Sequence, residues 1–165
     1  MIKQVYLDNA ATTPMASEVL EVMLPVLRDQ FGNPSSTHSF GRKTRALIEV
    51  SRRNIARMLN SAPSEIFFTS GGTEADNMAI KGAIESLGIM HVITSSIEHH
   101  AVGHTLESYE KNEKIKLSYV KLMPDGHVDL EDLERLLQEN ERSFVSLMHA
   151  NNEIGTLLPL KGVSI

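Results

Sequence analysis

Hydrophobic positions recur at helical spacing in several segments of the chain, with short apolar or alternating runs between them. Leucines on one face make Asp129–Asn140 the clearest predicted helix. The same spacing predicts four further helices: Ser17–Arg28, Gly41–Leu59, Thr73–Leu87 and His99–Lys111. Pro25 predicts a kink or an early end of the first helix, and Gly88 predicts the end of the third. The apolar runs predict five strands: Val5–Leu7, Ile66–Thr69, His91–Ser95, Ile115–Lys121 and Phe144–Met148.

From Ile66 onward these elements alternate as β-α-β-α-β-α-β. Such alternation predicts an α/β fold, a mostly parallel sheet with right-handed crossovers and helices on its faces. In open sheets of this kind, ligands bind beyond the carboxyl ends of the strands. Three polar segments follow predicted strands: S-G-G-T, S-S-I-E-H-H and H-A-N-N-E. We therefore expect a binding site at one edge of the sheet.

The first of these segments resembles a cup for a phosphate group. Ser70-Gly71-Gly72-Thr73 precedes a helix, whose N-terminus carries unpaired N–H groups and partial positive charge. The two glycines let an anion approach the backbone, and the two hydroxyls add donors. The segment is neither the ATP loop nor the dinucleotide fingerprint, so a single phosphate on a small molecule is expected. The alternative is a turn capped by Thr73, with Asp76 as its capping partner.

Histidines and amides follow the next strands. His99 could stack on a flat ligand or move a proton, or could simply begin a helix in solvent. His100 and His104 share a helical spacing that can bind zinc, with Glu98 or Glu107 as a third ligand, but such pairs also arise by chance and we expect no metal site. The asparagines of H-A-N-N-E could bind a ligand hydroxyl or carboxylate, or form an ordinary turn.

Composition narrows the classes of protein. The chain has 165 residues, enough for one domain, and a net charge of −5 that argues against a nucleic-acid binder. No apolar run is long enough for a bilayer, and no signal peptide is recognisable. Six basic residues share one helix, which favours a solvated face over an anion or RNA surface: Arg42, Lys43, Arg45, Arg52, Arg53 and Arg57. The sequence contains no cysteine.

Five segments, taken together and in order, resemble the cysteine desulfurases, which are pyridoxal-phosphate enzymes of the class V aminotransferase group. They are Y-L-D-N-A-A-T-T-P (6–14), F-G-N-P-S-S-T-H (31–38), F-T-S-G-G-T-E-A-D-N (68–77), E-H-H-A-V (98–102) and M-H-A-N-N-E-I-G-T (148–156). The resemblance implies the N-terminal portion of the fold-type I transferase large domain. It divides the chain into an arm (1–15), a partial large domain (16–157) and a divergent tail (158–165).

The resemblance also implies roles for four residues and a cofactor, pyridoxal 5'-phosphate. Gly72 and Thr73 match the positions that hold the cofactor phosphate. His99 matches the histidine that stacks on the pyridine ring and moves protons, and so is the implied catalytic residue. Asn152 matches the asparagine beside the phenolic oxygen of the ring and the substrate.

The implied reaction converts L-cysteine to L-alanine and passes the sulfur on for iron–sulfur cluster assembly. The family needs a Schiff-base lysine in an S-x-H-K segment and a persulfide cysteine, and these 165 residues match neither. We therefore expect the chain to be inactive alone. The expected partners are a complementary C-terminal chain or a second copy, and an iron–sulfur scaffold protein, in the cytoplasm, without nucleic acid or membrane. A non-catalytic phosphate-binding module and a fragment of another class V enzyme remain alternatives.

Overall fold

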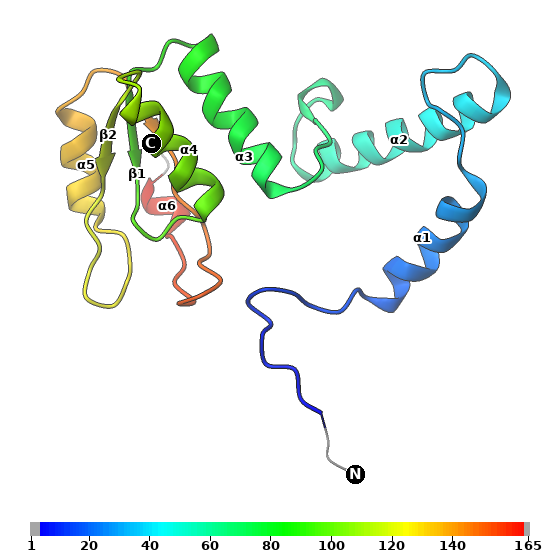
Figure 1. Cartoon of the computed structure of the whole chain (residues 1–165), viewed down its shortest axis with the longest axis horizontal. Helices are drawn as coiled ribbons and strands as arrows, with labels where there is room; N and C mark the ends of the chain where they lie inside the picture. Colours follow the sequence, from blue (N-terminus) through cyan, green and yellow to red (C-terminus); the bar gives the residue numbers. More distant parts are fainter. Residues whose placement is uncertain (1–3, 164–165) are drawn as a thin grey trace. The chain divides into compact units, whose positions relative to one another are not determined.

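The computed structural model describes residues 4–163 and divides the chain into two compact units, Met1–Phe68 and Thr69–Ile165 (Figure 1). The predicted divisions at 1–15, 16–157 and 158–165 stay predictions. The first three residues of the predicted arm and the last two of the predicted tail lie outside the described residues.

The first unit is helical. Its elements are α1 (Ser17–Asp29), α2 (Ser39–Met58) and the single 3-10 turn η1 (Pro63–Glu65). Helix α1 does not end early at Pro25 but continues to Asp29. Proline removes only one backbone hydrogen bond of a helix. Helix α2 begins after His38, whose Nδ1 accepts a hydrogen bond from the Gly41 N–H at 3.4 Å.

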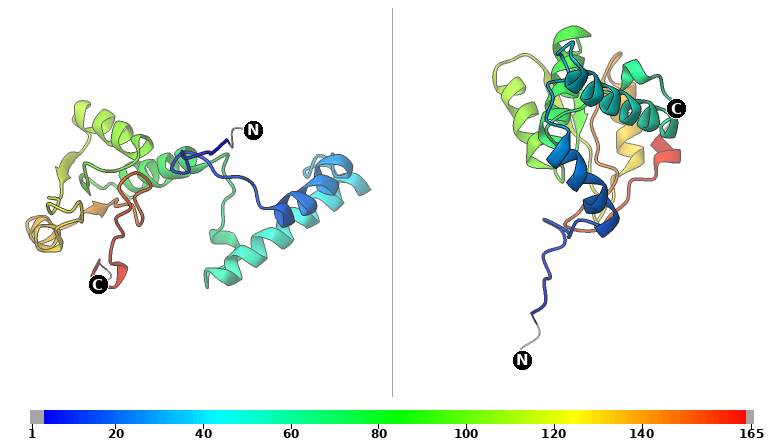
Figure 2. Two further views of the ribbon diagram at one scale, coloured as in Figure 1. Left: turned by 90° about the horizontal axis from the view of Figure 1, so that it is seen from below. Right: turned by 90° about the vertical axis from the view of Figure 1, so that its right-hand side faces the viewer.

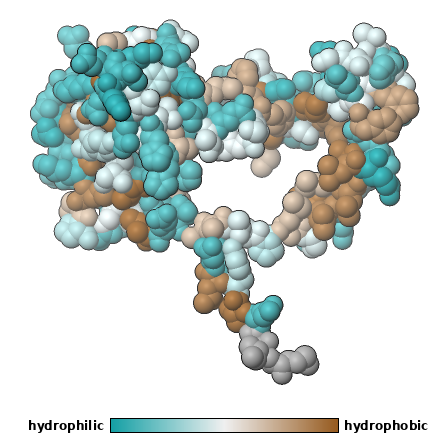
Figure 3. All heavy atoms as spheres, viewed as in Figure 1, coloured by the Kyte–Doolittle hydropathy of each residue, from teal (hydrophilic) through white to brown (hydrophobic). Residues whose placement is uncertain are grey.

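Most apolar side chains of the first unit face outward. Helix α1 has no buried residue, and in α2 only Gly41 and Ala56 are buried. Leu27 and Met58 are 71% and 84% exposed. Val26 of α1 and Leu47 of α2 line the same shallow groove. Figure 2 shows the ribbons of the two helices. Hydrophobic residues consequently gather on the surface of α1 (Figure 3).

The second unit contains a three-stranded parallel sheet in the order β2-β1-β3. Val92 of β1 lies beside Leu117 of β2 on one side and Phe144 of β3 on the other. Along the chain its elements are α3 (Gly72–Lys81), the π-helical turn η2 (Gly82–Ser86), β1 (His91–Thr94), α4 (His100–Lys111), β2 (Lys116–Tyr119), α5 (Leu130–Gln138), β3 (Phe144–Val145) and α6 (Leu160–Val163).

Helices cover both faces of this sheet, as predicted. Val92 faces one layer, where it packs in a cluster with Leu106 of α4 and Ile80 of α3. Ile93 points the opposite way and packs in a second cluster around Leu133 of α5. Successive residues of a strand face opposite sides of a sheet, so β1 is buried from both directions. Figure 1 shows α4 and α5 on opposite sides of the strands.

Two predicted strands do not form. Within residues 4–163, neither Val5–Leu7 nor Ile66–Thr69 pairs with another segment. Leu7 is 84% exposed and Phe67 is 70% exposed. A strand needs a neighbouring backbone to accept and donate its hydrogen bonds, and apolar character alone does not supply one. Only two of the three polar segments therefore follow strands of the sheet.

The helix predicted at Thr73–Leu87 is divided into α3 and η2. Its end near Gly88 is confirmed. Gly88 has a φ of +66°, a left-handed conformation that favours glycine and terminates helices.

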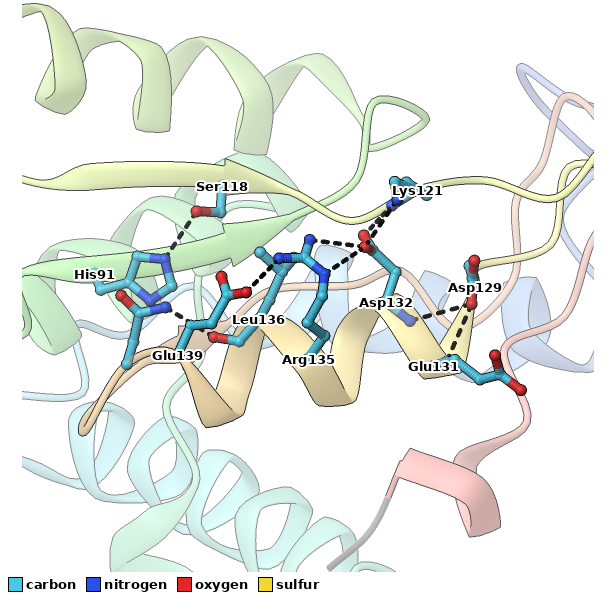
Figure 4. Close-up of polar contacts among 10 residues, drawn as sticks. His91, Ser118, Lys121, Asp129, Glu131, Asp132, Arg135, Leu136 and Glu139 are labelled. Atoms are coloured by element: carbon cyan, nitrogen blue, oxygen red, sulfur yellow. Dashed lines mark hydrogen bonds and ion pairs between the residues drawn. The ribbon is translucent and has the colours of Figure 1, made fainter.

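His91 is a buried histidine whose two ring nitrogens both have hydrogen-bond partners. Its ring nitrogens lie 2.7 Å from the Ser143 hydroxyl and 2.9 Å from the Ser118 hydroxyl, and the residue is 5% exposed. Figure 4 shows the Ser118 contact. Burial, and secondarily the charge of Lys116, lowers the pKa of His91 from its ordinary value of 6.5.

We predict that the second unit loses stability as the pH falls below about 6.5. The unfolded chain takes up a proton there while the folded chain does not, so protonation favours unfolding until the pH passes below the folded-state pKa. The stabilising contribution is present above the unfolded value. Urea unfolding at pH 7.5 and 5.5 should show a larger fall in midpoint for the parent chain than for His91→Gln. His149→Gln, at an exposed position, serves as the control. Equal falls in the parent and His91→Gln would contradict the prediction.

Candidate functional site

Two loops at the carboxyl edge of the sheet enclose a pocket of about 310 Å³. One loop follows β1 and leads into α4, and the other follows β3. Among the side chains that line it are Glu98, His99, Met148, Asn151 and Asn152. The structure therefore brings together two predicted site residues, His99 and Asn152, that are 53 positions apart in the sequence (152 − 99).

His99 is the N-cap of α4. Its Nδ1 accepts a hydrogen bond from the Ala101 N–H at 3.1 Å. A neutral imidazole with an accepting Nδ1 carries its proton on Nε2. The exposed ring thus presents an N–H donor, and its centroid lies 6.2 Å from that of the His100 ring. The capping bond fixes the backbone that carries His99 at the start of the helix.

Glu98 reaches from the first loop to the second. Its Oε1 accepts hydrogen bonds from the Met148 N–H at 2.7 Å and from the Ser95 hydroxyl at 3.0 Å. Burial is the largest influence on its carboxyl and raises its pKa, and the charge of Asp76 acts in the same direction. The hydrogen bonds from Met148 and Ser95 oppose this shift.

Asn151 reaches in the other direction. Its Nδ2 donates to the Ile97 carbonyl at 3.0 Å and contacts the Met148 sulfur at 3.2 Å. Its Oδ1 accepts from the Glu153 N–H at 2.8 Å and the Ile154 N–H at 3.0 Å. Asn151 is 8% exposed, whereas the next residue, Asn152, is exposed.

The predicted phosphate cup lies in the same unit but outside the residues that line this pocket. Helix α3 begins at Gly72, and a Cβ added at Gly71 or Gly72 would meet nothing within 4 Å, so the space beside both glycines is open. Thr73 is in the first turn and is exposed. Thr105 of α4 donates to the Asn77 Oδ1 at 2.9 Å, which ties the helix of the cup to the helix of His99.

Glu74 accepts hydrogen bonds from the two Ser70 groups, one of which, the hydroxyl, the sequence predicts as a donor to the phosphate. Its carboxylate accepts from the Ser70 N–H at 2.6 Å and the Ser70 hydroxyl at 2.7 Å. The backbone bond, followed by the hydroxyl bond, lowers the pKa of Glu74. The alternative prediction, a turn capped by Thr73 with Asp76 as its partner, is wrong. The N-cap residue of α3 is Gly71, and no side-chain cap bond is present there.

The zinc alternative gains no third ligand. The rings of His100 and His104 stack with their centroids 5.1 Å apart. Among residues 4–163, no group of three or more histidine, aspartate or glutamate side chains is placed to hold a metal ion. Over the same residues, no helix combines the length and apolar character needed to cross a membrane.

The sequence pattern does not predict the contacts of half-buried Glu98 and buried Asn151. It offers Glu98 only as a zinc ligand, and Asn151 only as one of several amides that could face a ligand. Their partners are 50 and 54 positions away, at Met148 and Ile97. No local pattern reports such contacts, because they depend on which loops the sheet places side by side.

Known proteins resemble this chain in sequence and in fold. The cysteine desulfurase IscS of Dictyoglomus turgidum is 48% identical over 168 residues, which covers 99% of this chain and 42% of that protein. A solved structure titled NifS-like protein is 40% identical with a TM-score of 0.89, over 98% of this chain and 44% of that one. Another, SspA in complex with cysteine, is 37% identical with a TM-score of 0.82, over 93% and 44%.

The chain thus spans less than half the length of these relatives. The model of the family described as aminotransferase class V matches residues 5–164. Since this match covers nearly the whole sequence, the chain belongs to the class V aminotransferase family.

Proposed function

We propose that the chain is the N-terminal part of a cysteine desulfurase. The observation that carries the proposal is the pocket where His99 and Asn152, from loops far apart in sequence, lie together at the carboxyl edge of a parallel sheet. Ligands bind at this edge in open α/β sheets. The relatives named above as cysteine desulfurases and NifS-like proteins support the assignment.

The chemistry of the donors fits pyridoxal 5'-phosphate, the cofactor of this family. The start of α3 offers backbone N–H groups, a partial positive charge and the Thr73 hydroxyl, and the space beside Gly71 and Gly72 is open. Gly72 and Thr73 would hold the phosphate. When bound, this cofactor supplies an electron sink for bonds broken at an amino acid.

His99 and Asn152 act at the ring end of the site. The His99 ring offers a flat face for stacking, and its protonated Nε2 can donate to the substrate side while Nδ1 remains held by the Ala101 N–H. Asn152 offers an amide for the phenolic oxygen of the ring or for the substrate carboxylate. Both residues would bind and orient the cofactor ring and the substrate, and only His99 would also hold or move a proton.

The proposed reaction takes sulfur from L-cysteine and leaves L-alanine, for delivery to an iron–sulfur scaffold protein in the cytoplasm. The persulfide needs a thiol, and these 165 residues contain no cysteine and no S-x-H-K segment for the Schiff-base lysine. Those groups would come from sequence beyond these residues or from a complementary chain, with a homodimer as the assembled form. The 165 residues alone would bind cofactor without turnover.

Titration of the purified chain with pyridoxal phosphate, followed by absorbance, tests the proposal. We expect saturable binding that inorganic phosphate competes for, because the cup recognises the phosphate. Thr73→Trp should abolish the binding, since the indole would fill the space at the helix start. Ser108→Trp, at an exposed position on α4, is the matched control and should bind normally.

Absence of binding at millimolar cofactor would remove the proposed function for this chain. Addition of L-cysteine to the loaded chain should release neither sulfide nor alanine, and sustained turnover would contradict the expected inactivity.

A further inference from the structure

We propose that Glu98 and Asn151 are positioning residues that set the separation of His99 and Asn152. Two hydrogen bonds, which we call the loop clasp, do this: the Glu98 carboxylate accepts from the Met148 N–H, and the Asn151 amide donates to the Ile97 carbonyl. The role of the clasp toward a ligand rests on the function proposed above; its presence does not.

The two bonds of the clasp run in opposite directions between the same two loops. They measure 2.7 Å from Met148 to Glu98 and 3.0 Å from Asn151 to Ile97. Each anchoring side chain immediately precedes a predicted site residue, since His99 follows Glu98 and Asn152 follows Asn151. A shift of either anchor would therefore move a site residue directly.

The sheet does not hold these loops by itself. Ladder pairing of β1 with β3 includes only Val92 with Phe144 and Ile93 with Val145. It is extended by the bond from the Ser146 N–H to the Ile93 carbonyl at 2.9 Å and by the Thr94 hydroxyl to the Ser146 carbonyl at 3.1 Å. Beyond Ser146, the two loops are joined by the Glu98 and Asn151 side chains of the clasp and no longer by the backbone ladder.

Both anchors are built to stay in place. Asn151 is 8% exposed, and its oxygen is held by two N–H groups of its own turn while its nitrogen crosses to the other loop. The Glu98 bond to Met148 is charge-assisted when the carboxyl is ionised, and the Ser95 hydroxyl fixes the same oxygen. Breaking either bond would leave a partly buried polar group without its partner, which resists opening.

Amide hydrogen exchange in the full chain tests the clasp without any ligand. Glu98→Ala should speed exchange at the Met148 N–H by about tenfold, the effect of losing one hydrogen bond of typical strength. Glu98→Gln keeps an accepting oxygen and should restore most of the protection. Glu107→Ala, at an exposed glutamate of α4, should change nothing at Met148. Unchanged exchange in Glu98→Ala would overturn the clasp.

Binding of pyridoxal phosphate and of inorganic phosphate, measured separately, distinguishes a positioning role of the clasp from a general effect on folding. Glu98→Ala and Asn151→Asp should each weaken pyridoxal phosphate binding by about tenfold while leaving inorganic phosphate binding at the cup unchanged. Asn151→Asp keeps the oxygen that closes its own turn but loses the donor to Ile97. An equal loss of both ligands would show a general structural effect and would overturn the positioning role. If the parent chain binds neither ligand, the proposed function fails, while hydrogen exchange at Met148 still decides the clasp.

Discussion

Leu106→Ala is expected to destabilise the second unit by about 2–5 kcal/mol. Leu106 is fully buried (0% exposed) on α4, in the cluster that also contains Val92 and Ile80. Shortening it removes apolar contacts between α4, α3 and the sheet and leaves a cavity that close-packed neighbours fill only in part. Urea unfolding followed by tyrosine fluorescence measures the change, because Tyr109 and Tyr119 lie in this unit.

Leu87→Ala is the matched control. Leu87 is 59% exposed, so its truncation should change the free energy of unfolding by less than about 0.5 kcal/mol. If the Leu106 and Leu87 variants unfolded at the same urea concentration, the assignment of Leu106 to the core would be wrong.

Asp132→Ala is expected to lower the free energy of unfolding by about 2–3 kcal/mol. The carboxylate is 3% exposed and lies at the start of α5 (Figure 4). It accepts from the Lys121 N–H at 3.0 Å and from the Arg135 Nη2 at 2.7 Å. Alanine would leave the Lys121 N–H without this acceptor. The Arg135 side chain is 49% exposed and can return to water, which places the loss below that of a fully buried pair.

Asp132→Asn separates the hydrogen bond from the charge. Its oxygen can still accept from Lys121, so we expect a loss of about 1 kcal/mol, from weaker bonding to Arg135. In the parent chain the Lys121 N–H, and next the Arg135 guanidinium, lowers the pKa of Asp132 from its ordinary value of 3.8. The ionised Asp132 carboxylate therefore stabilises the fold above that pH, and this stabilisation is lost as the pH falls through the lowered folded-state pKa. Equal stability of the alanine variant and the parent chain at pH 7 would refute this account.

The local features of the sequence were predicted well because their causes lie within a few residues. Asp129 caps α5 through the Glu131 and Asp132 N–H groups at 3.0 and 3.1 Å, close to where the leucine spacing begins. Gly88 ends its helix through its own backbone freedom. The alternation of strand and helix from His91 onward also predicts the parallel sheet, since each crossover places the next strand in the same direction.

The segment Ile66–Thr69 shows where a local pattern fails. Its apolar residues satisfy the strand pattern, but no strand pairs with it in the part of the chain that the structure describes. The phosphate cup was predicted from the helix that follows it, and that helix is present. The engagement of Ser70 by Glu74 depends on side-chain geometry that spacing does not report.

The sequence by itself determined the family, the order of the main elements and the candidates Gly72, Thr73, His99 and Asn152. Only the tertiary structure decided which candidates lie together, and that half-buried Glu98 and buried Asn151 join their loops. The physical reason is range. Helix propensity, capping and backbone freedom act between near neighbours, whereas a hydrogen bond between loops 50 or more positions apart exists only after the sheet has brought them side by side.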